Sequence, residues 1–288
     1  MNINEVQTKQ IGVVGAGQMG RGIAQVAAMS GFQVIVYDLF PQSLQKGQDF
    51  IFNQWDKGLA KNKWTKEAVE MAKTKLSFTS TIEDFSSADL IIEAASENKS
   101  IKFELFKKID QIAKKEAILA SNTSSISITE IASHTKRPEK VCGMHFMNPV
   151  PVMKLVEGIR GLTTDKATFE EVEKVALVMG KTFVKAEDYP GFCVNRILMP
   201  MINEAIYALY EGVASARDID AAMKLGTNQP MGPLELADFI GLDTCLAIMN
   251  VLYEGLGDSK YRPCPLLKNY VAAQKLGLKV KRGFYDYE

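Results

Sequence analysis

The sequence predicts an α/β protein in which a doubly wound, mainly parallel sheet is followed by an all-α domain. A glycine-rich turn joins a short apolar run to a helical pattern near the N-terminus, and β-branched runs then alternate with helical stretches. Beyond about residue 188 only helix-length patterns occur. Proline and glycine interrupt the pattern at EDYPGF (187–192), so we place the boundary between domains 1–188 and 189–288 there.

Composition indicates an ordinary soluble globular protein. The 288 residues are 47% hydrophobic, and 34 Lys and Arg balance 34 Asp and Glu, so no overall field attracts nucleic acid or an anionic membrane. No apolar run approaches the roughly 20 residues that span a bilayer, and the N-terminus lacks the apolar segment of a signal peptide. The four cysteines form no CxxC pair, so we expect free thiols, no metal site and a cytoplasmic location.

The first element expected is a strand at 10–14, QIGVV, which leads directly into the turn GAGQMG at 15–20. In such a G-x-G-x-x-G turn, Gly15 makes the tight turn, Gly17 lets the backbone approach a pyrophosphate, and Gly20 lets helix and strand pack closely. The helix that follows offers unpaired N–H groups and the positive end of its dipole to phosphates. The pattern therefore predicts a dinucleotide site.

A β-branched run at 32–38, FQVIVYD, comes next and ends in Asp38. An acid at the end of the second strand can accept hydrogen bonds from both ribose hydroxyls of a dinucleotide, and its charge would repel a 2′-phosphate. The sequence therefore favours NAD over NADP. Arg21, just inside the first helix, could weaken this preference, but we interpret it as a solvent-facing residue.

The helical segment at 41–73 is larger than a simple crossover, and we expect a helical hairpin that projects from the sheet. Lys57 and Lys61 are four residues apart and share a helix face, with Lys63 nearby. Such a basic face is most often simply solvated. The functional alternative is a clamp for a phosphate-rich ligand.

Further strands are expected at 75–79, 88–95, 117–121 and 140–146, with a helix at 100–113. Doubly wound sheets bind their ligands at the carboxyl ends of the strands. Polar clusters follow three of these strands, namely SEN (96–98) with Lys102 downstream, SNTSS (121–125), and His145 with Asn148. This convergence favours a chemical site over simple packing.

One of the two histidines, His145, ends an apolar run that is followed by a proline-containing turn and then by Glu157. The flanking runs VCGMH and VMKLVE would pair as adjacent strands and bring these two side chains together. A histidine can accept the proton of an alcohol, while a carboxylate on its other ring nitrogen fixes the tautomer and stabilises the imidazolium. Ser124 and Ser125 end a neighbouring strand and could hold the substrate oxygen, whereas His134 is expected to be exposed and inert.

The second domain is expected to be entirely helical. The segment 191–212 has apolar residues at helical spacing, with Pro200 as a kink or junction, and Ser215 with Asp218 three residues later resembles a capping box. The segment 234–257 has a strong helical pattern that is interrupted by glycines. Several faces of this domain are apolar, so we expect a homodimer that forms through it.

Several of these segments together resemble the pattern of the L-3-hydroxyacyl-CoA dehydrogenase family, and the match runs from about residue 10 to the GFYDY near the C-terminus. In order, they are GAGQMGRGIAQ, EAASENKSIK, SNTSS, KVCGMHFMNPVPVMKLVE, GFCVNR and PMGPLELADFIGLD. The chain looks most like the short, single-function forms that act on 3-hydroxybutyryl-CoA. The resemblance implies a Rossmann NAD-binding domain followed by a helical domain for substrate binding and dimerisation.

The resemblance also implies a reaction, the reversible NAD-dependent oxidation of an L-3-hydroxyacyl-CoA to the 3-oxoacyl-CoA, as used in fatty-acid and butyrate metabolism. His145 would be the general base and Glu157 its orienting partner. Ser124 would bind the substrate hydroxyl and contact the cofactor, and Asn195 would bind at the acyl carbonyl. The other cofactor contacts implied are Gly15, Gly17, Gln18, Met19, Gly20, Asp38, Glu97, Lys102, Asn122, Asn148 and, in the tail, Lys279 or else Lys281.

By the same resemblance, Lys57 and Lys61 match positions that meet the CoA, which reverses their interpretation as a solvated face. Two other classes of function stay open. A dinucleotide-binding relative that has lost catalysis would be expected to lack His145, Glu157 or Asn195, and this chain retains all three. A dehydrogenase of a free hydroxy acid or sugar acid with the same architecture would have no use for the lysine face.

Overall fold

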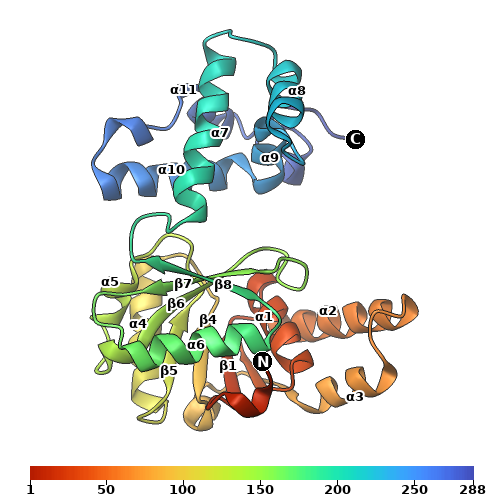
Figure 1. Cartoon of the computed structure of the whole chain (residues 1–288), viewed down its shortest axis with the longest axis vertical. Helices are drawn as coiled ribbons and strands as arrows, with labels where there is room; N and C mark the ends of the chain where they lie inside the picture. The colour runs from red at the N-terminus through yellow and green to blue at the C-terminus, as the bar shows by residue number, and fades with distance from the viewer. The chain divides into compact units, whose positions relative to one another are not determined.

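A computed structural model describes residues 1–288, and the chain divides into two compact units, Met1–Asp188 and Tyr189–Glu288 (Figure 1). The first unit contains one eight-stranded sheet with the strand order β3-β2-β1-β4-β5-β6-β7-β8. Its strands are β1 (Gln10–Val14), β2 (Gln33–Tyr37), β3 (Leu76–Thr79), β4 (Leu90–Glu93), β5 (Ile118–Ser121), β6 (Val141–Phe146), β7 (Leu155–Arg160) and β8 (Thr182–Glu187).

All neighbouring strands pair in parallel except β6 and β7, which are antiparallel. The predicted doubly wound, mainly parallel sheet is therefore confirmed. The four strands expected after the hairpin segment are present as β3 to β6. Strand β8 and the helix before it, α6, were not expected.

Along the chain, each helix of the first unit is separated from the next by one or more strands, apart from α2 and α3, which follow one another. They are α1 (Gln18–Met29), α2 (Pro41–Ala60), α3 (Lys66–Thr74), α4 (Lys99–Ile112), α5 (Ile128–Ala132) and α6 (Lys166–Val178). Short 3-10 turns occupy Ile3–Glu5, Ile82–Ser87 and Pro138–Lys140. Helices α2 and α3 form the predicted hairpin, which extends beyond the edge of the sheet in Figure 1.

Polar side chains cap four of these helices. The side chains of Thr65, Asn98, Ser127 and Asp165 accept hydrogen bonds from backbone N–H groups in the first turns of α3, α4, α5 and α6. Each cap satisfies an N–H group that has no partner within its helix, which contributes about 1 kcal/mol. The caps therefore help to set the residue at which each of these helices begins.

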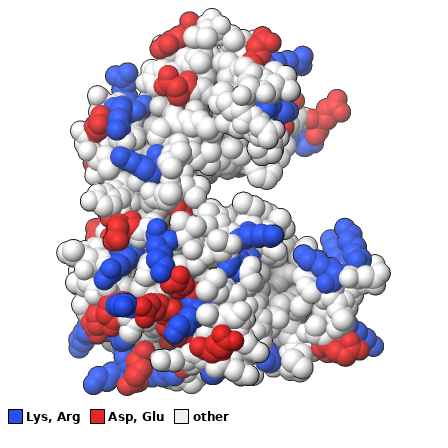
Figure 2. All heavy atoms as spheres, viewed as in Figure 1, with Lys and Arg blue, Asp and Glu red and all other residues white.

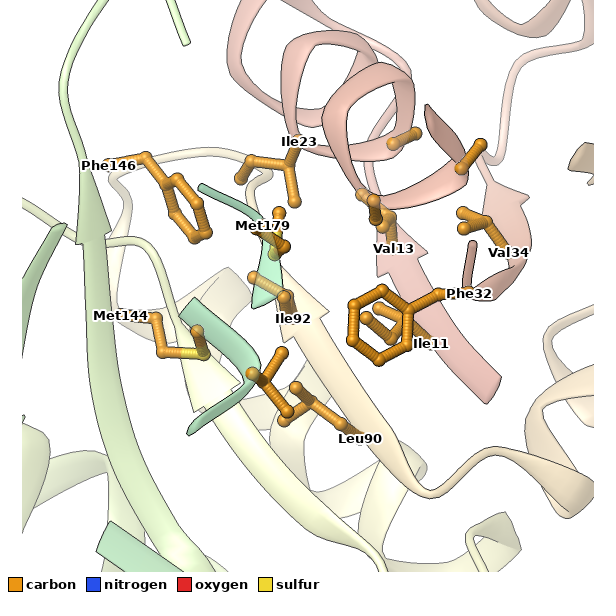
Figure 3. Close-up of a cluster of buried hydrophobic side chains, with 14 of the residues drawn as sticks. Ile11, Val13, Ile23, Phe32, Val34, Leu90, Ile92, Met144, Phe146 and Met179 are labelled. Atoms are coloured by element: carbon orange, nitrogen blue, oxygen red, sulfur yellow. The ribbon is translucent and has the colours of Figure 1, made fainter. Parts of the chain in front are cut away.

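Alternate strand residues form the hydrophobic core on one face of the sheet (Figure 3). Successive residues of a strand point to opposite faces, so every second residue of β1, β4 and β6 lies on this side. The labelled members are Ile11, Val13, Ile23, Phe32, Val34, Leu90, Ile92, Met144, Phe146 and Met179. Full burial of one such side chain contributes about 1.5–3 kcal/mol. This core makes the strands a rigid platform for the polar residues at their carboxyl ends.

The second unit is entirely helical, as predicted. Its helices are α7 (Val194–Tyr210), α8 (Ala216–Thr227), α9 (Pro233–Ile240), α10 (Leu242–Leu256) and α11 (Pro265–Ala272), with 3-10 turns at Ser259–Tyr261 and Leu278–Val280. Helix α7 continues through Pro200, and Ser215 caps α8 by accepting a hydrogen bond from the N–H of Asp218. None of the helices combines the length and the apolar character of a membrane span; α9 and α10 reach them only as a pair, and the chain bends by 98° between the two.

The four cysteines are free thiols, as expected. Cys142, Cys245 and Cys264 are buried, whereas Cys193 is exposed. Burial, helped by nearby carboxylates, raises the pKa of Cys142 and of Cys245 to about 12. Cys142 in the first unit and Cys245 in the second therefore act as small hydrophobic groups at neutral pH.

Candidate active site

The glycine-rich turn between β1 and α1 has the three features that a bound pyrophosphate needs. Gly15 adopts φ +99° and donates its N–H to the carbonyl of Tyr37 at 2.7 Å, which closes the turn against β2. A Cβ at Gly20 would lie 1.8 Å from the carbonyl oxygen of Gly15, so only glycine permits this packing of helix on turn. A Cβ at Gly17 would meet nothing within 4 Å. The space beside Gly17 is therefore open to a ligand, and the turn fits a dinucleotide.

Asp38, directly after β2, is held beside this turn by two backbone hydrogen bonds. Its Oδ2 accepts the N–H of Ala16 at 2.9 Å, and its Oδ1 accepts the N–H of Phe40 at 3.0 Å. A carboxylate accepts further hydrogen bonds through its remaining lone pairs. The position fits an acid that binds the adenosine ribose of a dinucleotide.

Predicted cofactor residues from distant parts of the sequence are joined by hydrogen bonds near the start of α1 and the ends of β5 and β6. Gln18 begins α1, and its Nε2 donates to Oδ1 of Asn148, in the turn after β6, at 3.0 Å. Asn122, after β5, accepts the N–H of Phe146 through its Oδ1 at 2.9 Å. These bonds tie the carboxyl ends of β5 and β6 and the start of α1 into one polar surface.

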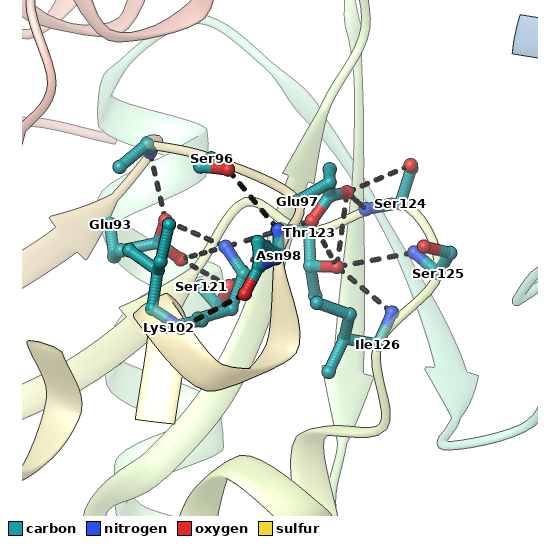
Figure 4. A network of polar contacts seen from close by, with 12 residues as sticks. Glu93, Ser96, Glu97, Asn98, Lys102, Ser121, Thr123, Ser124, Ser125 and Ile126 are labelled. Atoms are coloured by element: carbon teal, nitrogen blue, oxygen red, sulfur yellow. Dashed lines mark hydrogen bonds and ion pairs between the residues drawn. The ribbon is translucent and has the colours of Figure 1, made fainter. Parts of the chain in front are cut away.

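A buried ionic network lies at the end of β4 (Figure 4). Both carboxylate oxygens of Glu93 accept from the ammonium group of Lys102, at 2.6 and 2.5 Å, and Oε2 also accepts the hydroxyl of Ser121 at 2.7 Å. Lys102 is only 2% exposed. Buried charges of this kind persist only when paired and hydrogen-bonded. Lys102, predicted as a cofactor contact, is therefore committed to Glu93, which the sequence analysis had not singled out.

Glu97 connects this network to the polar loop after β5. Its carboxylate lies 3.6 Å from the Lys102 ammonium and accepts both the N–H and the hydroxyl of Ser124, at 2.7 and 3.0 Å. It also accepts the hydroxyl of Thr123 at 2.9 Å. The N–H bond alone can hold Ser124 on Glu97, so its hydroxyl can rotate to donate to the oxygen of a bound ligand.

His145 and Glu157 lie opposite each other in the antiparallel pairing of β6 with β7. Nδ1 of His145 is 2.7 Å from Oε2 of Glu157, so the contact expected from the proline-linked strands is present. Glu157 is fully buried and His145 is 8% exposed. A carboxylate cannot donate, so Nδ1 carries the proton and Nε2 of the neutral ring is the atom that can accept one. The pair has the geometry of a general base with an orienting carboxylate.

The remaining predicted residues lie elsewhere. Lys57 is in the last turn of α2 and Lys61 is its C-cap residue; both are exposed. Figure 2 shows Lys and Arg side chains gathered on the α2 side of the hairpin's free end. Asn195 lies in the first turn of α7, and the ammonium of Lys279 pairs with Asp243 at 2.6 Å; both belong to the second unit.

Two expectations about charged residues were wrong. His134 is half-buried, with its ring stacked on Phe103 at a centroid distance of 4.1 Å and its Nδ1 2.9 Å from the carbonyl of Glu130. Arg21 does not face solvent freely, because its guanidinium lies over the ring of Phe50 on α2. In both cases an aromatic ring from a distant part of the sequence, Phe103 on α4 or Phe50 on α2, packs on the charged or polar group, and spacing along the sequence does not reveal such a contact.

Two family models together match nearly all of the chain. Residues 10–189 match the model described as 3-hydroxyacyl-CoA dehydrogenase, NAD binding domain, and residues 191–287 match 3-hydroxyacyl-CoA dehydrogenase, C-terminal domain. The chain is 57% identical to a probable 3-hydroxybutyryl-CoA dehydrogenase of Bacillus subtilis, covering 98% of this chain and 99% of that one. It is 55% identical to a 3-hydroxybutyryl-CoA dehydrogenase of Bradyrhizobium diazoefficiens, covering 97% and 95%.

A solved structure agrees with these matches. The crystal structure of an (S)-3-hydroxybutyryl-CoA dehydrogenase from Ralstonia eutropha superimposes with a TM-score of 0.96 at 47% sequence identity, covering 98% of this chain and 100% of that one. A match at this level extends over both units, so the helical arrangement within the second unit is shared as well as the sheet of the first.

Proposed function

The chain belongs to the 3-hydroxyacyl-CoA dehydrogenase family, and on that premise we propose that it is an NAD-dependent 3-hydroxybutyryl-CoA dehydrogenase. The reaction would interconvert (S)-3-hydroxybutyryl-CoA and acetoacetyl-CoA. The observation that carries the proposal is the His145–Glu157 pair, 2.7 Å apart at the carboxyl end of β6. This pair supplies the acid–base group that oxidation of an alcohol requires, on the same edge of the sheet as the glycine turn.

The cofactor is NAD, which the residues around the glycine turn fit. Gly15, Gly17 and Gly20 shape the turn for the pyrophosphate, and Asp38 is placed for the ribose. When bound, NAD would supply the acceptor for the hydride that leaves C3 of the substrate, and NADH would supply the hydride in the reverse direction. Further cofactor contacts are proposed for Gln18, Met19, Glu97, Lys102, Asn122, Ser124, Asn148 and Lys279. Lys102 is buried, so its contribution would be indirect, through its ion pair with Glu97.

In the proposed mechanism, the substrate hydroxyl lies between Ser124 and Nε2 of His145. As the C3–H bond breaks, Nε2 accepts the hydroxyl proton and the imidazole becomes an imidazolium, which the buried Glu157 carboxylate stabilises. Asn195 would bind the acyl carbonyl. A positioned base of this kind contributes roughly 10²–10⁴-fold to the rate.

The CoA moiety is proposed to bind along α2, where Lys57 and Lys61 are exposed and form no ion pair with any side chain. A net charge of zero gives the protein no general attraction for an anion, so local cations must supply it. We further propose a cytoplasmic homodimer that acts in fatty-acid or butyrate metabolism. Exposed apolar residues of the second unit support dimerisation through it, among them Val213 at 72% and Leu225 at 88% exposure.

The proposal is tested by following NADH oxidation with acetoacetyl-CoA, free acetoacetate and, separately, NADPH as the reductant. Rapid turnover with the thioester and NADH, and little with either alternative, would support the reaction class, CoA recognition and the role of Asp38 together. Tight NADH binding without turnover of the thioester would refute the proposal and favour a relative without catalysis. A series of longer 3-oxoacyl-CoA substrates then defines the acyl-chain preference.

A further inference from the structure

Arg21 is a cation without a counter-ion, held on an aromatic ring. It lies in the first turn of α1, and its guanidinium carbon is 3.7 Å from the centroid of the Phe50 ring on α2. Its Nε is buried with no hydrogen-bond partner, and no acidic side chain pairs with it. A cation near a helix N-terminus also meets the positive end of the helix dipole, which disfavours it. The arrangement is favourable once an anion from outside the chain binds there.

The ring beneath Arg21 belongs to the same flank of α2 as the two exposed lysines. Lys57 and Lys61 follow Phe50 by seven and eleven residues, about two and three turns, so the three side chains lie along one side of the helix. Asp49 and Asp56 lie about 100° further round α2, away from this flank. Arg21 therefore extends a row of unpaired cations from α2 to the first turn of α1.

We infer that Arg21, held on Phe50, is a third cationic contact for the nucleotide phosphates of acyl-CoA and helps to select CoA thioesters over smaller ones. The inference rests on the proposed function, because it takes an acyl-CoA as the ligand. Guanidinium is suited to both contacts, since its planar face stacks on an aromatic ring while its fork of N–H groups binds phosphate oxygens.

The competing ligand for Arg21 is the pyrophosphate of NAD, which also needs a cationic environment. The glycine turn and the first N–H groups of α1 already form a complete anion site for it. The Arg21 side chain leaves that turn and lies on α2, alongside the lysine flank rather than the turn. The ligand assigned to Arg21 is therefore the CoA nucleotide.

The test compares two thioesters that differ only in the nucleotide, acetoacetyl-CoA and S-acetoacetylpantetheine. Replacing Arg21 by Ala should raise KM for acetoacetyl-CoA about 10-fold, equivalent to about 1.4 kcal/mol, with kcat nearly unchanged, because binding shared by ground and transition states is lost. KM for the pantetheine thioester and the Kd of NADH should not change. Phe50→Leu, which keeps the charge but removes the ring, should give a smaller rise for acetoacetyl-CoA alone.

Arg160→Ala is the matched control, because Arg160 is an exposed arginine without an ion pair at the end of β7. It should leave both KM values unchanged. An equal rise for both thioesters with Arg21→Ala, a weaker affinity for NADH, or no rise at all would overturn the inference. Failure of the wild-type protein to reduce acetoacetyl-CoA would instead refute the proposed function, so the two failures are distinguishable. A melting temperature within a few degrees of wild type excludes a merely structural effect.

Discussion

Replacing Glu157 by Gln should slow the chemical step while leaving the fold and cofactor binding intact. The amide keeps the size of the side chain, and its oxygen can still accept the Nδ1–H of His145, so the ring orientation is preserved. What disappears is the negative charge 2.7 Å from Nδ1 when the ring takes up a proton. The variant therefore separates charge stabilisation from positioning.

The size of the effect follows from Coulomb's law. A carboxylate whose charge lies about 4 Å from the centre of the imidazolium stabilises it by about 4 kcal/mol at an effective dielectric constant of about 20. If half of the proton has transferred in the transition state, the loss is about 2 kcal/mol, or about 30-fold in kcat. Complete transfer would give about 10³-fold. The prediction is thus a 30- to 10³-fold fall in kcat for the oxidation of (S)-3-hydroxybutyryl-CoA by NAD, the direction in which His145 takes up the proton.

The assay measures kcat and KM for (S)-3-hydroxybutyryl-CoA with NAD, together with the Kd for NADH and the melting temperature of each variant. Glu171→Gln is the matched control, because Glu171 is another buried carboxylate of the first unit, bonded to the N–H and hydroxyl of Thr8 at 2.8 and 2.9 Å. It should lower the melting temperature but not kcat. A kcat of Glu157→Gln within about 3-fold of wild type would show that the Glu157 charge does not stabilise the transition state, and so would a loss of activity that merely follows loss of the fold.

Three further predictions concern the cofactor, pH and thiols. Asp38→Ala should raise KM for NADH about 10-fold, because a charge-assisted hydrogen bond to the ribose is lost. It should also raise kcat/KM for NADPH relative to that for NADH, because the carboxylate no longer repels the 2′-phosphate. Burial alone would raise the pKa of Asp89, but hydrogen bonds from Lys114 and from two backbone N–H groups outweigh burial and hold the pKa below 3.8. The stability that Asp89 contributes is therefore present above pH 3.8 and is lost as the pH falls through the lowered pKa. Asp89→Asn should thus lower the free energy of unfolding by about 1 kcal/mol at pH 7 and by less at pH 3, and denaturant unfolding at the two pH values measures this. Because burial raises the pKa of Cys142 to about 12, a thiol reagent should modify Cys193 quickly in the native protein and all four cysteines only after unfolding.

The parts of the fold that the sequence predicted are those with a local signal. Gly15, Gly17 and Gly20 each occupy the position that their mechanical role requires, and the strands leading to the site are short, buried and β-branched. The contact of His145 with Glu157 was also predictable, because two apolar runs joined by a short proline-containing turn pair as neighbours. A short connection between two strands limits which of their residues can lie opposite each other, so it helps to fix the pairing register.

The missed elements lack such a signal. Strand β8 (Thr182–Glu187) lies at the edge of the sheet, is mostly exposed and shows no strong apolar alternation. Its Phe183 packs edge-to-face on Phe169 of α6, so both elements are stabilised by a contact between them. Local propensity is weak at such positions, and tertiary packing decides.

The missed polar contacts join residues that are distant in sequence. Lys102 reaches Glu93 across a loop and the first turn of α4, and burial of the pair follows only from the strands around it. Arg21 meets Phe50 through the packing of α1 against α2. Sequence patterns identified the charged residues but not their partners, which is why Lys102 was expected at the surface of the site and Arg21 in solvent.

His145 is assigned as the acid–base group of a dehydrogenase, and the kcat of His145→Gln with acetoacetyl-CoA and NADH, measured beside the Kd of NADH, tests this assignment. We expect a fall of roughly 10²–10⁴-fold in kcat with NADH affinity unchanged, because the glycine turn and Asp38 are untouched. Turnover within a few-fold of wild type would contradict the assignment of His145, and so would a loss of activity explained by a loss of NADH binding.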